Sequence, residues 1–484
     1  MEEERGRYKM EEIKNFINGK YLDPIAGRYI YNYEPGTGEV YGKIPNSTLA
    51  DLKLAVSAAD KVFPFWSTLE IDQRSRILLK LADLIEENTE ELAEAESRDN
   101  GKPLWLAKSV DIPRASANFR FYASAIVNFS SEAHIQEAFM VNYTRRAPLG
   151  IVGCISPWNL PLYLFSWKVA PALSMGNCVI AKPSELTPMT AYMLGELANE
   201  AGLPAGILNV LHGEGKGIGQ AIVEHSATKA ISFTGGTTTG KIVGAIAAKQ
   251  FKKVSLELGG KNPSIVFADC DLEEAVEVNI KSSFINQGEI CLCSSRILIE
   301  DSLYEEFKSR FLREVSKLQV SDPKDPESYC GALVSEQHLL KVASYVQLAI
   351  DEGGDVLLGG NRINREGYFF EPTVIEGLDE NCRTNQEEIF GPVVTLNSFS
   401  SEEEAISLAN CTRYGLSCTI WTNDLKKAHR VSHSIESGII WVNCWLLRDL
   451  RTPFGGMRDS GVGREGGEEA LRFFSEPQNV CIKI

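Results

Sequence analysis

The segment Gly150-Ile-Val-Gly-Cys-Ile-Ser-Pro-Trp-Asn-Leu-Pro161 begins with a short β-branched run and ends in a turn that contains two prolines. Similar apolar runs recur downstream, separated by stretches with helical spacing, at 178–181, 207–211, 230–233 and 254–256. This alternation predicts βα units, which build a parallel sheet with helices on both faces. Ligands of such sheets bind at the carboxyl ends of the strands. The residues that directly follow each run are therefore the first candidates for a functional site.

The sequence on either side of this block predicts further elements. Residues 1–45 contain the turns Asn18-Gly19 and Gly36-Thr-Gly38, which are typical of short hairpins. Residues 49–107 have apolar residues at helical spacing. The candidate helix caps in that region are Asp51, Asp72 and Thr89. A second alternating block covers 262–445, with strands expected at 372–375 and 438–442.

Two outlying segments have the composition of strands. The chain ends in an apolar run at 480–484, and residues 122–143 contain a candidate hairpin. One reading pairs these two pieces in a small separate sheet. The alternative is that the C-terminal strand lies at the edge of its own domain's sheet.

The overall composition excludes several classes of protein. With 484 residues, 44% of them hydrophobic and 24% charged, the chain is expected to form a folded protein of two or three domains. A net charge of −16 argues against nucleic-acid binding, which needs clustered Lys and Arg. No apolar run approaches the roughly 20 residues that span a bilayer. The first residues are charged and lack the apolar core of a signal peptide, so we expect a cytoplasmic protein.

The cysteines and histidines indicate neither a disulfide framework nor a metal site. The 11 cysteines are scattered, which favours reduced thiols, most of them small buried core residues. The 6 histidines are dispersed and form no metal-binding spacing with the cysteines. We therefore expect no metal.

Two segments bring reactive side chains to glycine-containing turns. Phe284-Ile-Asn-Gln-Gly-Glu-Ile-Cys-Leu-Cys-Ser-Ser-Arg296 places Cys291 three residues after a glycine, and Leu256-Glu-Leu-Gly-Gly-Lys-Asn-Pro263 places Glu257 at a strand end. A thiol can form a covalent thioester, and a carboxylate can activate the water that hydrolyses it. Cys293 is a local rival of Cys291. No histidine neighbours either cysteine, so activation by nearby amides and a bound positive charge is expected rather than a Cys–His pair.

These segments resemble the active-site motifs of the aldehyde dehydrogenase superfamily, and the resemblance covers nearly the whole chain. It implies an α/β fold with a Rossmann-like NAD-binding domain (1–124 and 146–258), an α/β catalytic domain (259–459) and small β oligomerisation strands (125–145 and 465–484). It also implies a homodimer or homotetramer. In this family the nucleophile would be Cys291, the general base Glu257, and an oxyanion donor the amide of Asn159.

The resemblance implies NAD as the cofactor and assigns residues to it. Lys182, Ser184 and Glu185 follow the strand at 178–181, and a carboxylate there binds ribose hydroxyls and repels a 2′-phosphate, which favours NAD over NADP. The glycine-rich turn Phe233-Thr-Gly-Gly-Thr-Thr-Thr-Gly240 suits a pyrophosphate, although this chain has Gly236 where the family often has serine. The remaining cofactor candidates are Ile155, Trp158, Gly235, Leu258, Glu388 and Phe390.

The substrate is expected to carry a carboxylate. The matched positions in the subgroup that oxidises 2-aminomuconic and 2-hydroxymuconic semialdehydes are arginines that grip such a group, here Arg114 and Arg448, with Arg451 as an alternative to Arg448. A competing reading pairs these arginines with Asp449 or another acid. The apolar substrate candidates are Leu160 and Phe454.

The resemblance to this subgroup implies oxidation of 2-aminomuconic semialdehyde to 2-aminomuconate as the leading reaction. The alternatives within the enzyme class are 2-hydroxymuconic semialdehyde, retinal or another uncharged aldehyde. Glu257 favours hydrolysis of the thioester over transfer to coenzyme A. A non-catalytic relative is disfavoured because Cys291, Glu257 and Asn159 are all intact.

Overall fold

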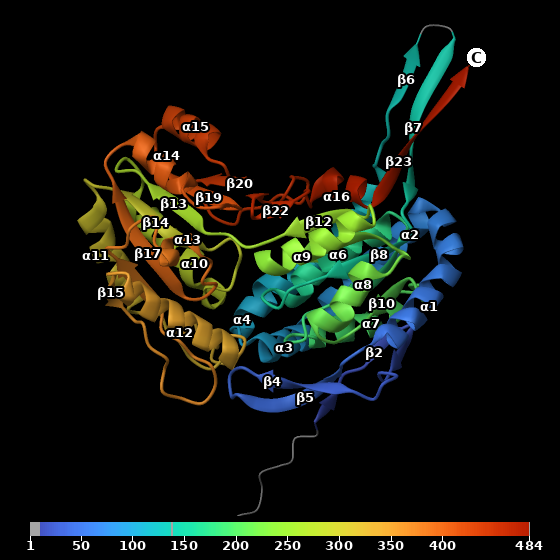
Figure 1. Cartoon of the computed structure of the whole chain (residues 1–484), viewed down its shortest axis with the longest axis horizontal. Helices are drawn as coiled ribbons and strands as arrows, with labels where there is room; N and C mark the ends of the chain where they lie inside the picture. The colour runs from blue at the N-terminus through green and yellow to red at the C-terminus, as the bar shows by residue number, and fades with distance from the viewer. Residues whose placement is uncertain (1–9, 137–138, 484) are drawn as a thin grey trace, which may run out of the picture.

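The computed structural model describes residues 10–136 and 139–483 and forms two lobes with a projecting arm (Figure 1). One lobe is built on an eight-stranded sheet and the other on a seven-stranded sheet. The arm is a three-stranded antiparallel sheet. The terminal residues 1–9 and 484, and the pair 137–138, which belong to predicted domain segments, lie outside the described residues.

The eight-stranded sheet follows the predicted alternation of strands and helices. Its five central strands are parallel and its outer strands antiparallel. In spatial order they are β22 (Gly461–Val462), β12 (Lys253–Glu257), β11 (Thr228–Thr234), β8 (Ile151–Ile155), β9 (Cys178–Lys182), β10 (Leu208–Val210), β2 (Asn15–Ile17) and β3 (Lys20–Leu22). The strands expected after residue 150 are thus confirmed within one or two residues at their ends.

Helices cover both faces of this sheet, as βα connections require. Contacts place α1 (Leu49–Thr68), α8 (Gln220–Glu224) and α9 (Thr237–Lys249) on one face, and α6 (Pro161–Ser174) and α7 (Met189–Glu200) on the other. Behind α6 lie α2 (Ile71–Glu87), α3 (Thr89–Asn100) and α5 (Ile112–Val127), and the short helices α4 (Leu104–Leu106) and η1 (Ala107–Asp111) join α3 to α5. A further short helix, η2 (Gly215–Gly219), precedes α8.

The predicted helix caps were wrong by one to three residues. Thr48 caps α1 through its hydroxyl, and Asp51 completes a capping box by accepting from the Thr48 backbone. Asp72 lies inside the first turn of α2. Thr89 is the first residue of α3, and Asn88 occupies the cap position. The predicted residues do lie in the first turns, where the helix dipole favours acidic groups, but Thr48, Glu70 and Asn88 occupy the cap positions.

The second lobe has a mostly parallel sheet with its own covering helices. Its strands, in spatial order, are β15 (Asp355–Leu358), β16 (Thr373–Glu376), β17 (Val393–Phe399), β14 (Ser294–Glu300), β13 (Asn262–Val266), β19 (Ser417–Trp421) and β20 (Ile439–Val442). Successive residues of β14 point to opposite faces, because Ile297 packs with α10 (Leu272–Phe284) and α11 (Tyr304–Val315), whereas Leu298 packs with α14 (Glu402–Asn410) and α15 (Leu425–Ser434). The other helices of this lobe are η3 (Ile285–Gly288), α12 (Glu336–Asp351) and α13 (Arg383–Gln386).

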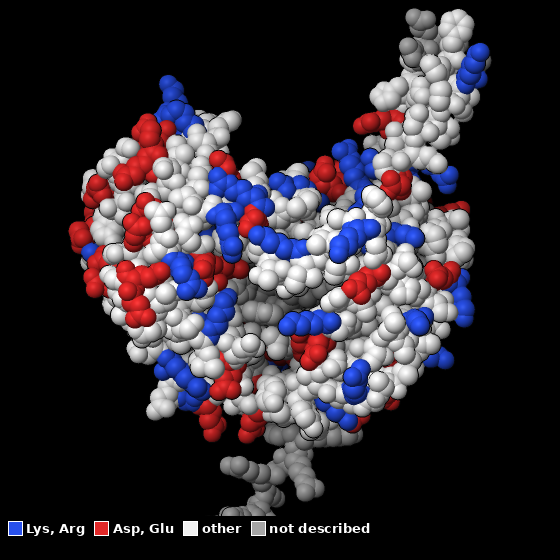
Figure 2. Space-filling model, in the orientation of Figure 1, with Lys and Arg blue, Asp and Glu red and all other residues white. Residues whose placement is uncertain are grey.

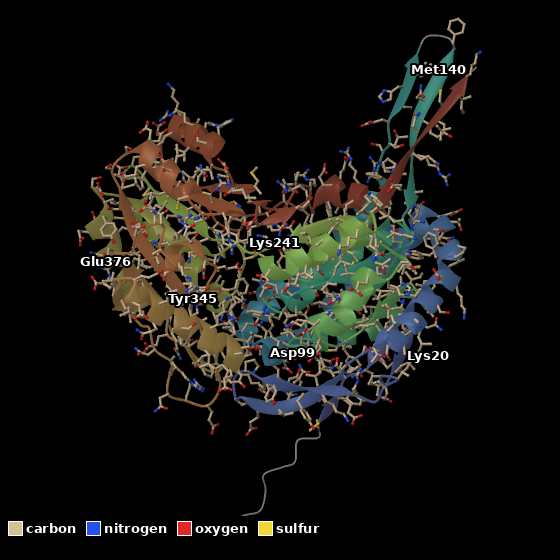
Figure 3. The ribbon with its side chains drawn as sticks, viewed as in Figure 1. Lys20, Asp99, Met140, Lys241, Tyr345 and Glu376 are labelled. Carbon is tan, nitrogen blue, oxygen red and sulfur yellow. The ribbon has the colours of Figure 1, made fainter. Side chains whose placement is uncertain are left out.

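The arm joins segments that lie far apart in the sequence. Its strands are β6 (Ala133–Gln136), β7 (Met140–Pro148) and β23 (Ser475–Lys483), which follows α16 (Gly467–Phe473). Met140 lies toward the outer end of this arm (Figure 3). The expected pairing of the hairpin with the C-terminal run is confirmed, and the alternative of an edge strand on a large sheet is wrong. The first part of 122–143 is helical instead, because α5 continues to Val127.

Small sheets complete the fold. A three-stranded sheet is formed by β1 (Glu11–Glu12), β5 (Glu39–Pro45) and β4 (Tyr29–Glu34), and a two-stranded one by β18 (Tyr414–Gly415) and β21 (Met457–Arg458). Within the described ranges, no helix is long and apolar enough to cross a membrane.

Candidate active site

The carboxyl ends of the first sheet face the loop that carries Cys291. A cavity of about 220 Å³ lies between them and is lined by residues from both lobes. Eight residues predicted from the sequence line this cavity: Trp158, Asn159, Gly235, Gly236, Leu258, Cys291, Glu388 and Phe390. The structure therefore brings the thiol, the amide donor and most cofactor candidates to one place.

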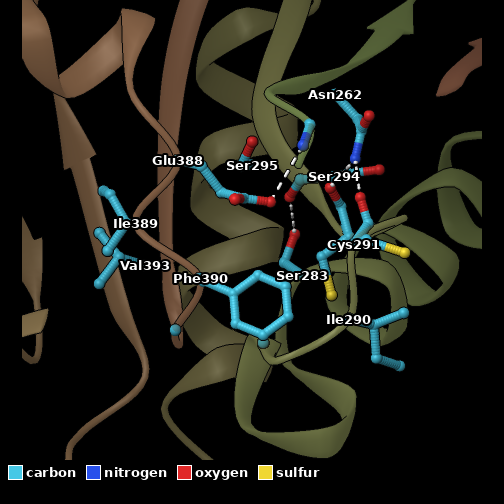
Figure 4. Close-up of a pocket in the computed structure, with 14 residues that line it drawn as sticks. Asn262, Ser283, Ile290, Cys291, Ser294, Ser295, Glu388, Ile389, Phe390 and Val393 are labelled. Atoms are coloured by element: carbon cyan, nitrogen blue, oxygen red, sulfur yellow. Dashed lines mark hydrogen bonds between the residues drawn. The ribbon is translucent and has the colours of Figure 1, made fainter. Parts of the chain in front are cut away.

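A left-handed turn delivers Cys291 to the cavity. Asn286, Gln287 and Gly288 have φ angles of 53°, 56° and 71°. A Cβ on Gly288 would lie 2.2 Å from the carbonyl oxygen of Gly391, so only glycine fits there. The Asn262 side chain then fixes the turn, because its Nδ2 donates to the carbonyl oxygens of Cys291 at 2.7 Å and Cys293 at 2.9 Å (Figure 4).

The two neighbouring cysteines differ in their access to the cavity. Cys291 is partly exposed and lines the cavity, whereas Cys293 is buried in the core. Burial, together with the carboxyl groups of Glu388 and Glu257, raises the pKa of the Cys291 thiol. The protein's own groups thus favour the neutral thiol. A positive charge bound in the cavity would favour the thiolate.

Hydrogen bonds hold both the side chain and the backbone of Asn159. The side-chain Nδ2 donates to the carbonyl oxygen of Glu289 at 2.9 Å, which leaves one N–H for another acceptor. The backbone carbonyl oxygen of Asn159 accepts from Lys102 Nζ at 3.1 Å and from Asn286 Nδ2 at 3.2 Å. Lys102 is fully buried and pairs with Asp111 at 2.8 Å. The bond to Glu289 fixes the direction of the amide and the backbone bonds anchor the residue that carries it, as a preorganised oxyanion donor requires.

Glu257 lies at the end of β12 with an unusual environment for a carboxylate. It is 4% exposed, and neither carboxyl oxygen has a hydrogen-bond partner among the described residues. Burial and the nearby Glu465 raise the pKa of Glu257 well above its ordinary value. Glu465 is itself paired with Lys168 at 2.7 Å. A carboxyl group with a raised pKa and open oxygens is suited to accept a proton from water.

The predicted ribose-binding residues lie together at the end of β9 and in the loop that follows it. Lys182 Nζ donates to Glu185 Oε2 at 2.9 Å. Burial acts in the opposite direction, but the positive charge and hydrogen bond of Lys182 lower the pKa of Glu185, so the group stays ionised. Ser184 is buried and accepts from the backbone N–H of Leu186 at 3.2 Å. Ile155, at the end of the neighbouring strand β8, is 7% exposed.

Glu388 and Phe390 close the other side of the cavity. Glu388 Oε1 accepts from the backbone N–H of Gly260 at 3.0 Å (Figure 4). The Phe390 ring meets the Trp158 ring edge to face, with centroids 5.2 Å apart. Phe390 has a φ of 62°, a strained conformation for a non-glycine residue. Its carbonyl oxygen contacts His338 Nε2 at 2.6 Å, which holds the strained turn.

The three predicted arginines line one open surface depression, but they differ in their partners. Arg448 lies over the ring of Phe454, 4.0 Å from its centroid, and Arg114 lies 5.5 Å from the ring centroid of Tyr163. Among the described residues, neither of these two arginines forms an ion pair. Leu160 is buried at the start of α6.

Arg451 is the arginine that forms an ion pair with Asp449. Its Nε and Nη2 contact the carboxyl oxygens at 3.0 and 2.5 Å, and its side chain is 79% exposed. The hydrogen bonds from Arg451 lower the pKa of Asp449 to about 2. The competing reading, an internal pair with Asp449, thus applies to Arg451 and not to Arg448.

Some residues at the site had no signal in the sequence. The residues are Lys102, Tyr163, Lys168, His338 and Glu465, and none lies in a motif singled out for that role. Lys168 and Glu465 are 297 positions apart and meet only because the chain returns through β22. Such long-range pairs leave no local pattern.

Comparisons with known proteins agree with this geometry. The model of the aldehyde dehydrogenase family matches residues 22–480. The chain belongs to the aldehyde dehydrogenase family. It is 48% identical to the human 2-aminomuconic semialdehyde dehydrogenase, with 97% of this chain and 98% of that protein covered. It is 44% identical to the 2-hydroxymuconic semialdehyde dehydrogenase of Pseudomonas sp. (strain CF600), with 98% and 100% covered.

Solved aldehyde dehydrogenase structures share the fold. The NAD⁺ complex of an aldehyde dehydrogenase from Bacillus cereus superimposes with a TM-score of 0.96 at 38% identity, covering 98% of this chain and 97% of that chain. An indole-3-acetaldehyde dehydrogenase complexed with NAD⁺ gives a TM-score of 0.96 at 37% identity, covering 99% and 98%. The predicted family and fold are confirmed.

The residues of this aldehyde dehydrogenase fit a dinucleotide. Gly236 directly precedes α9, and a side chain there would meet no atom within 4 Å, so the backbone amides of the helix start are open to a diphosphate. The face in Figure 2 is hollowed between the two lobes, and Lys and Arg side chains lie along the rim. In the same view, Lys241 of α9 lies above the hollow (Figure 3). Within the described ranges, no cluster of three or more metal-binding side chains is found.

Proposed function

We propose that this aldehyde dehydrogenase uses NAD⁺ to oxidise a carboxylate-bearing semialdehyde to the acid, with 2-aminomuconic semialdehyde as the leading substrate. The observation that carries the substrate class is the pair Arg114 and Arg448, which share one depression and have no acidic partner among the described residues. Burying part of an unpaired guanidinium costs free energy unless an anion binds to it and offsets the lost hydration. The names of the relatives, four of them 2-aminomuconic semialdehyde dehydrogenases at 47–48% identity, favour the same class.

Cys291 begins the chemistry. The thiol releases its proton to solvent, and the resulting thiolate sulfur bonds to the aldehyde carbon. The carbonyl oxygen becomes an oxyanion that the remaining N–H of Asn159 and the backbone N–H of Cys291 stabilise. A bound NAD⁺ would supply the acceptor for the hydride that leaves the aldehyde carbon. The oxidised product on the sulfur is a thioester.

Glu257 completes the cycle. Its carboxylate takes a proton from a water molecule, the water oxygen attacks the thioester carbon, and the Cys291 thiolate leaves as the acid is released. The raised pKa of Glu257 makes it a stronger base than an exposed glutamate. Hydrolysis rather than transfer to coenzyme A follows from the presence of this base.

For the cofactor, we assign the ribose hydroxyls to Lys182 and Glu185, with Ser184 shaping that loop. The diphosphate is assigned to Gly235 and Gly236, and the nicotinamide end to Glu388 and Phe390. Apolar contacts would come from Ile155, Trp158 and Leu258. Six of these residues share the cavity: Trp158, Gly235, Gly236, Leu258, Glu388 and Phe390. The roles of Ile155, Lys182, Ser184 and Glu185 rest on their places at or just after the ends of β8 and β9 and on the family's motifs.

The domain division follows the two sheets. We assign 1–124 and 146–258 to the NAD-binding domain, 259–459 to the catalytic domain, and 125–145 with 465–484 to oligomerisation. The arm supports a homodimer or homotetramer, since a small sheet that stands clear of the core needs a partner for stability (Figure 1). A cytoplasmic location is supported by 11 cysteines that are all free thiols.

Two arginine variants test the substrate class. Arg448→Met should lower kcat/KM for a carboxylate-bearing semialdehyde by about 30-fold to a few thousandfold, as loss of one arm of a charged clamp costs about 2–5 kcal/mol. Arg451→Met is the matched control, because that side chain is exposed and paired with Asp449. Equal effects of the two substitutions, or none from Arg448→Met, would contradict the clamp.

A further inference from the structure

Tyr163 lies between the two unpaired arginines. It occupies the first turn of α6, four residues after Asn159, and is 5% exposed. Its hydroxyl oxygen accepts from Arg448 Nη1 at 2.9 Å, and its ring lies 5.5 Å from the guanidinium carbon of Arg114. One side chain thus contacts both candidate arms of the clamp.

The other contacts of Arg448 leave its orientation incomplete. Its guanidinium lies over Phe454, at 4.0 Å, and over Trp167, at 4.9 Å from the ring centroids. Contacts between a flat cation and aromatic faces set the plane of the group but restrain rotation within that plane weakly. The directed hydrogen bond to Tyr163 supplies the missing restraint. It determines which N–H groups of Arg448 remain for an anion.

Tyr163 is itself held in place by the core. Its carbonyl oxygen accepts from Asn118 Nδ2 at 3.1 Å and from Ser166 Oγ at 2.8 Å. In the described part of the chain, no acceptor is found for its hydroxyl hydrogen. The hydroxyl therefore accepts from Arg448 and keeps its own hydrogen for a further oxygen.

We propose that Tyr163 is a positioning residue that aims Arg448, and through its ring Arg114, at the substrate carboxylate. The proposal rests on the proposed function, because it assumes that the two arginines bind a carboxylate. It predicts that the hydroxyl of Tyr163 contributes to recognition of charged substrates only. An uncharged aldehyde has no carboxylate for Arg448 to bind, so its kcat/KM should not depend on the orientation of that side chain.

The test compares Tyr163→Phe with Tyr21→Phe. Both substitutions remove one hydrogen-bonded hydroxyl, since Tyr21 Oη donates to the carbonyl oxygen of Tyr192 at 2.7 Å, but Tyr21 lies in β3 at the far edge of the sheet. Each variant is measured with a carboxylate-bearing semialdehyde and with an uncharged aldehyde of equal length. Thermal unfolding is followed for both, because a purely structural role would lower stability without changing the substrate ratio.

Tyr163→Phe is expected to lower kcat/KM for the charged substrate roughly tenfold, the effect of one lost hydrogen bond to a charged group, and for the uncharged substrate less than about twofold. A second readout is competitive inhibition by an unsaturated six-carbon diacid. Its inhibition constant should rise by a similar factor, while the Kd for NAD⁺ stays unchanged. Tyr21→Phe should leave the substrate ratio and the inhibition constant as in the wild type.

The outcomes separate this inference from the proposed function. If Arg448→Met abolishes the preference for the charged substrate and Tyr163→Phe leaves it intact, the positioning role is wrong and the clamp stands. If neither variant changes the preference, both the clamp and the positioning role are wrong. If Tyr163→Phe lowers kcat/KM for both substrates by the same factor, the hydroxyl has a general structural role and the inference is overturned.

Discussion

At the scale of single residues, the surroundings of Cys291 and Glu257 favour the protonated forms of both side chains, which are not the forms that react. Burial raises the pKa of the Cys291 thiol and of the Glu257 carboxyl, so both favour the protonated state in the protein alone. The thiolate becomes favourable when positive charge enters the cavity. The carboxylate becomes favourable as pH rises. The proposed chemistry is therefore expected to depend on occupancy of the cofactor site and on pH.

The first prediction concerns the nucleophile. Cys291→Ala should lower turnover by at least about a thousandfold, because no other thiol among the described residues lines this cavity. The Kd for NAD⁺, measured by fluorescence quenching, should stay within about twofold of the wild type. Cys293→Ala is the matched control and should retain most of its activity, since that sulfur lies in the core. Substantial turnover by Cys291→Ala would remove the assigned nucleophile.

The second prediction concerns the base. Glu257→Gln should release one equivalent of NADH in a burst and then turn over slowly, because the thioester forms but its hydrolysis lacks a proton acceptor. Rapid-quench or stopped-flow absorbance separates the two phases. Fast linear kinetics without a burst would contradict the role of Glu257.

Glu257 should also affect stability in a pH-dependent way. Its folded pKa is raised, so its contribution to stability is fully present below the unfolded pKa and is lost as pH rises through the folded pKa. Each unit of pKa shift corresponds to about 1.4 kcal/mol. Glu257→Gln should therefore gain stability relative to the wild type as pH rises above the ordinary glutamate pKa of 4.5, measured by denaturant unfolding. A stability difference that stays constant as pH rises above that value would contradict the buried, unpaired carboxyl.

At the scale of elements, the strand ends could be predicted and the contacts between them could not. The runs before Asn159, Glu185 and Gly235 show a local β-branched pattern, and the motifs follow directly. β22 has only the residues Gly461–Val462 and carries no pattern, yet it pairs with β12 and brings Glu465 toward Glu257. The helix caps were misplaced by up to three residues because two capping-type side chains lie close together at the starts of α1 and α3, and because α2 begins after Glu70 without a side-chain cap.

The loop after β9 gives a prediction about cofactor choice. Glu185→Ala should narrow the preference for NAD over NADP by about tenfold or more, because an ionised carboxylate accepts ribose hydroxyls and repels a 2′-phosphate. The ratio of kcat/KM for the two cofactors is the measurement. Glu214→Ala is a suitable control. That acid is exposed and lies in the loop after β10, and among the described residues its side chain forms no ion pair. An unchanged ratio in Glu185→Ala would contradict the ribose assignment.

At the scale of the whole molecule, the stability of the arm is expected to depend on contacts with another chain as well as on the contacts within its own sheet. β23 contributes nine residues to one edge of the arm, and most of its side chains are exposed. Ile135 and Ile482 are 76% and 50% exposed on this small sheet. Long exposed edges with apolar side chains are typical of surfaces that pair with another chain. The sequence indicated the strands, but only the fold shows that they leave both large sheets.

Deletion of residues 475–484 tests that dependence. The truncated chain should lose the proposed oligomeric state, since β7 loses its partner along nine residue pairs. Light scattering coupled to size-exclusion chromatography measures the mass, and NAD⁺ binding reports whether the first lobe still folds. If the truncated protein has the same number of chains per particle as the full-length protein, the proposed role of the arm is wrong.

The most direct test of the account is a substrate comparison with the wild-type protein and NAD⁺. The account predicts that kcat/KM for an unsaturated semialdehyde bearing a carboxylate exceeds that for an uncharged aldehyde of equal length by about a hundredfold or more, the effect of a charged clamp. The semialdehyde is generated in situ and NADH formation is followed by absorbance. A ratio near one would contradict the recognition of a carboxylate by Arg114 and Arg448.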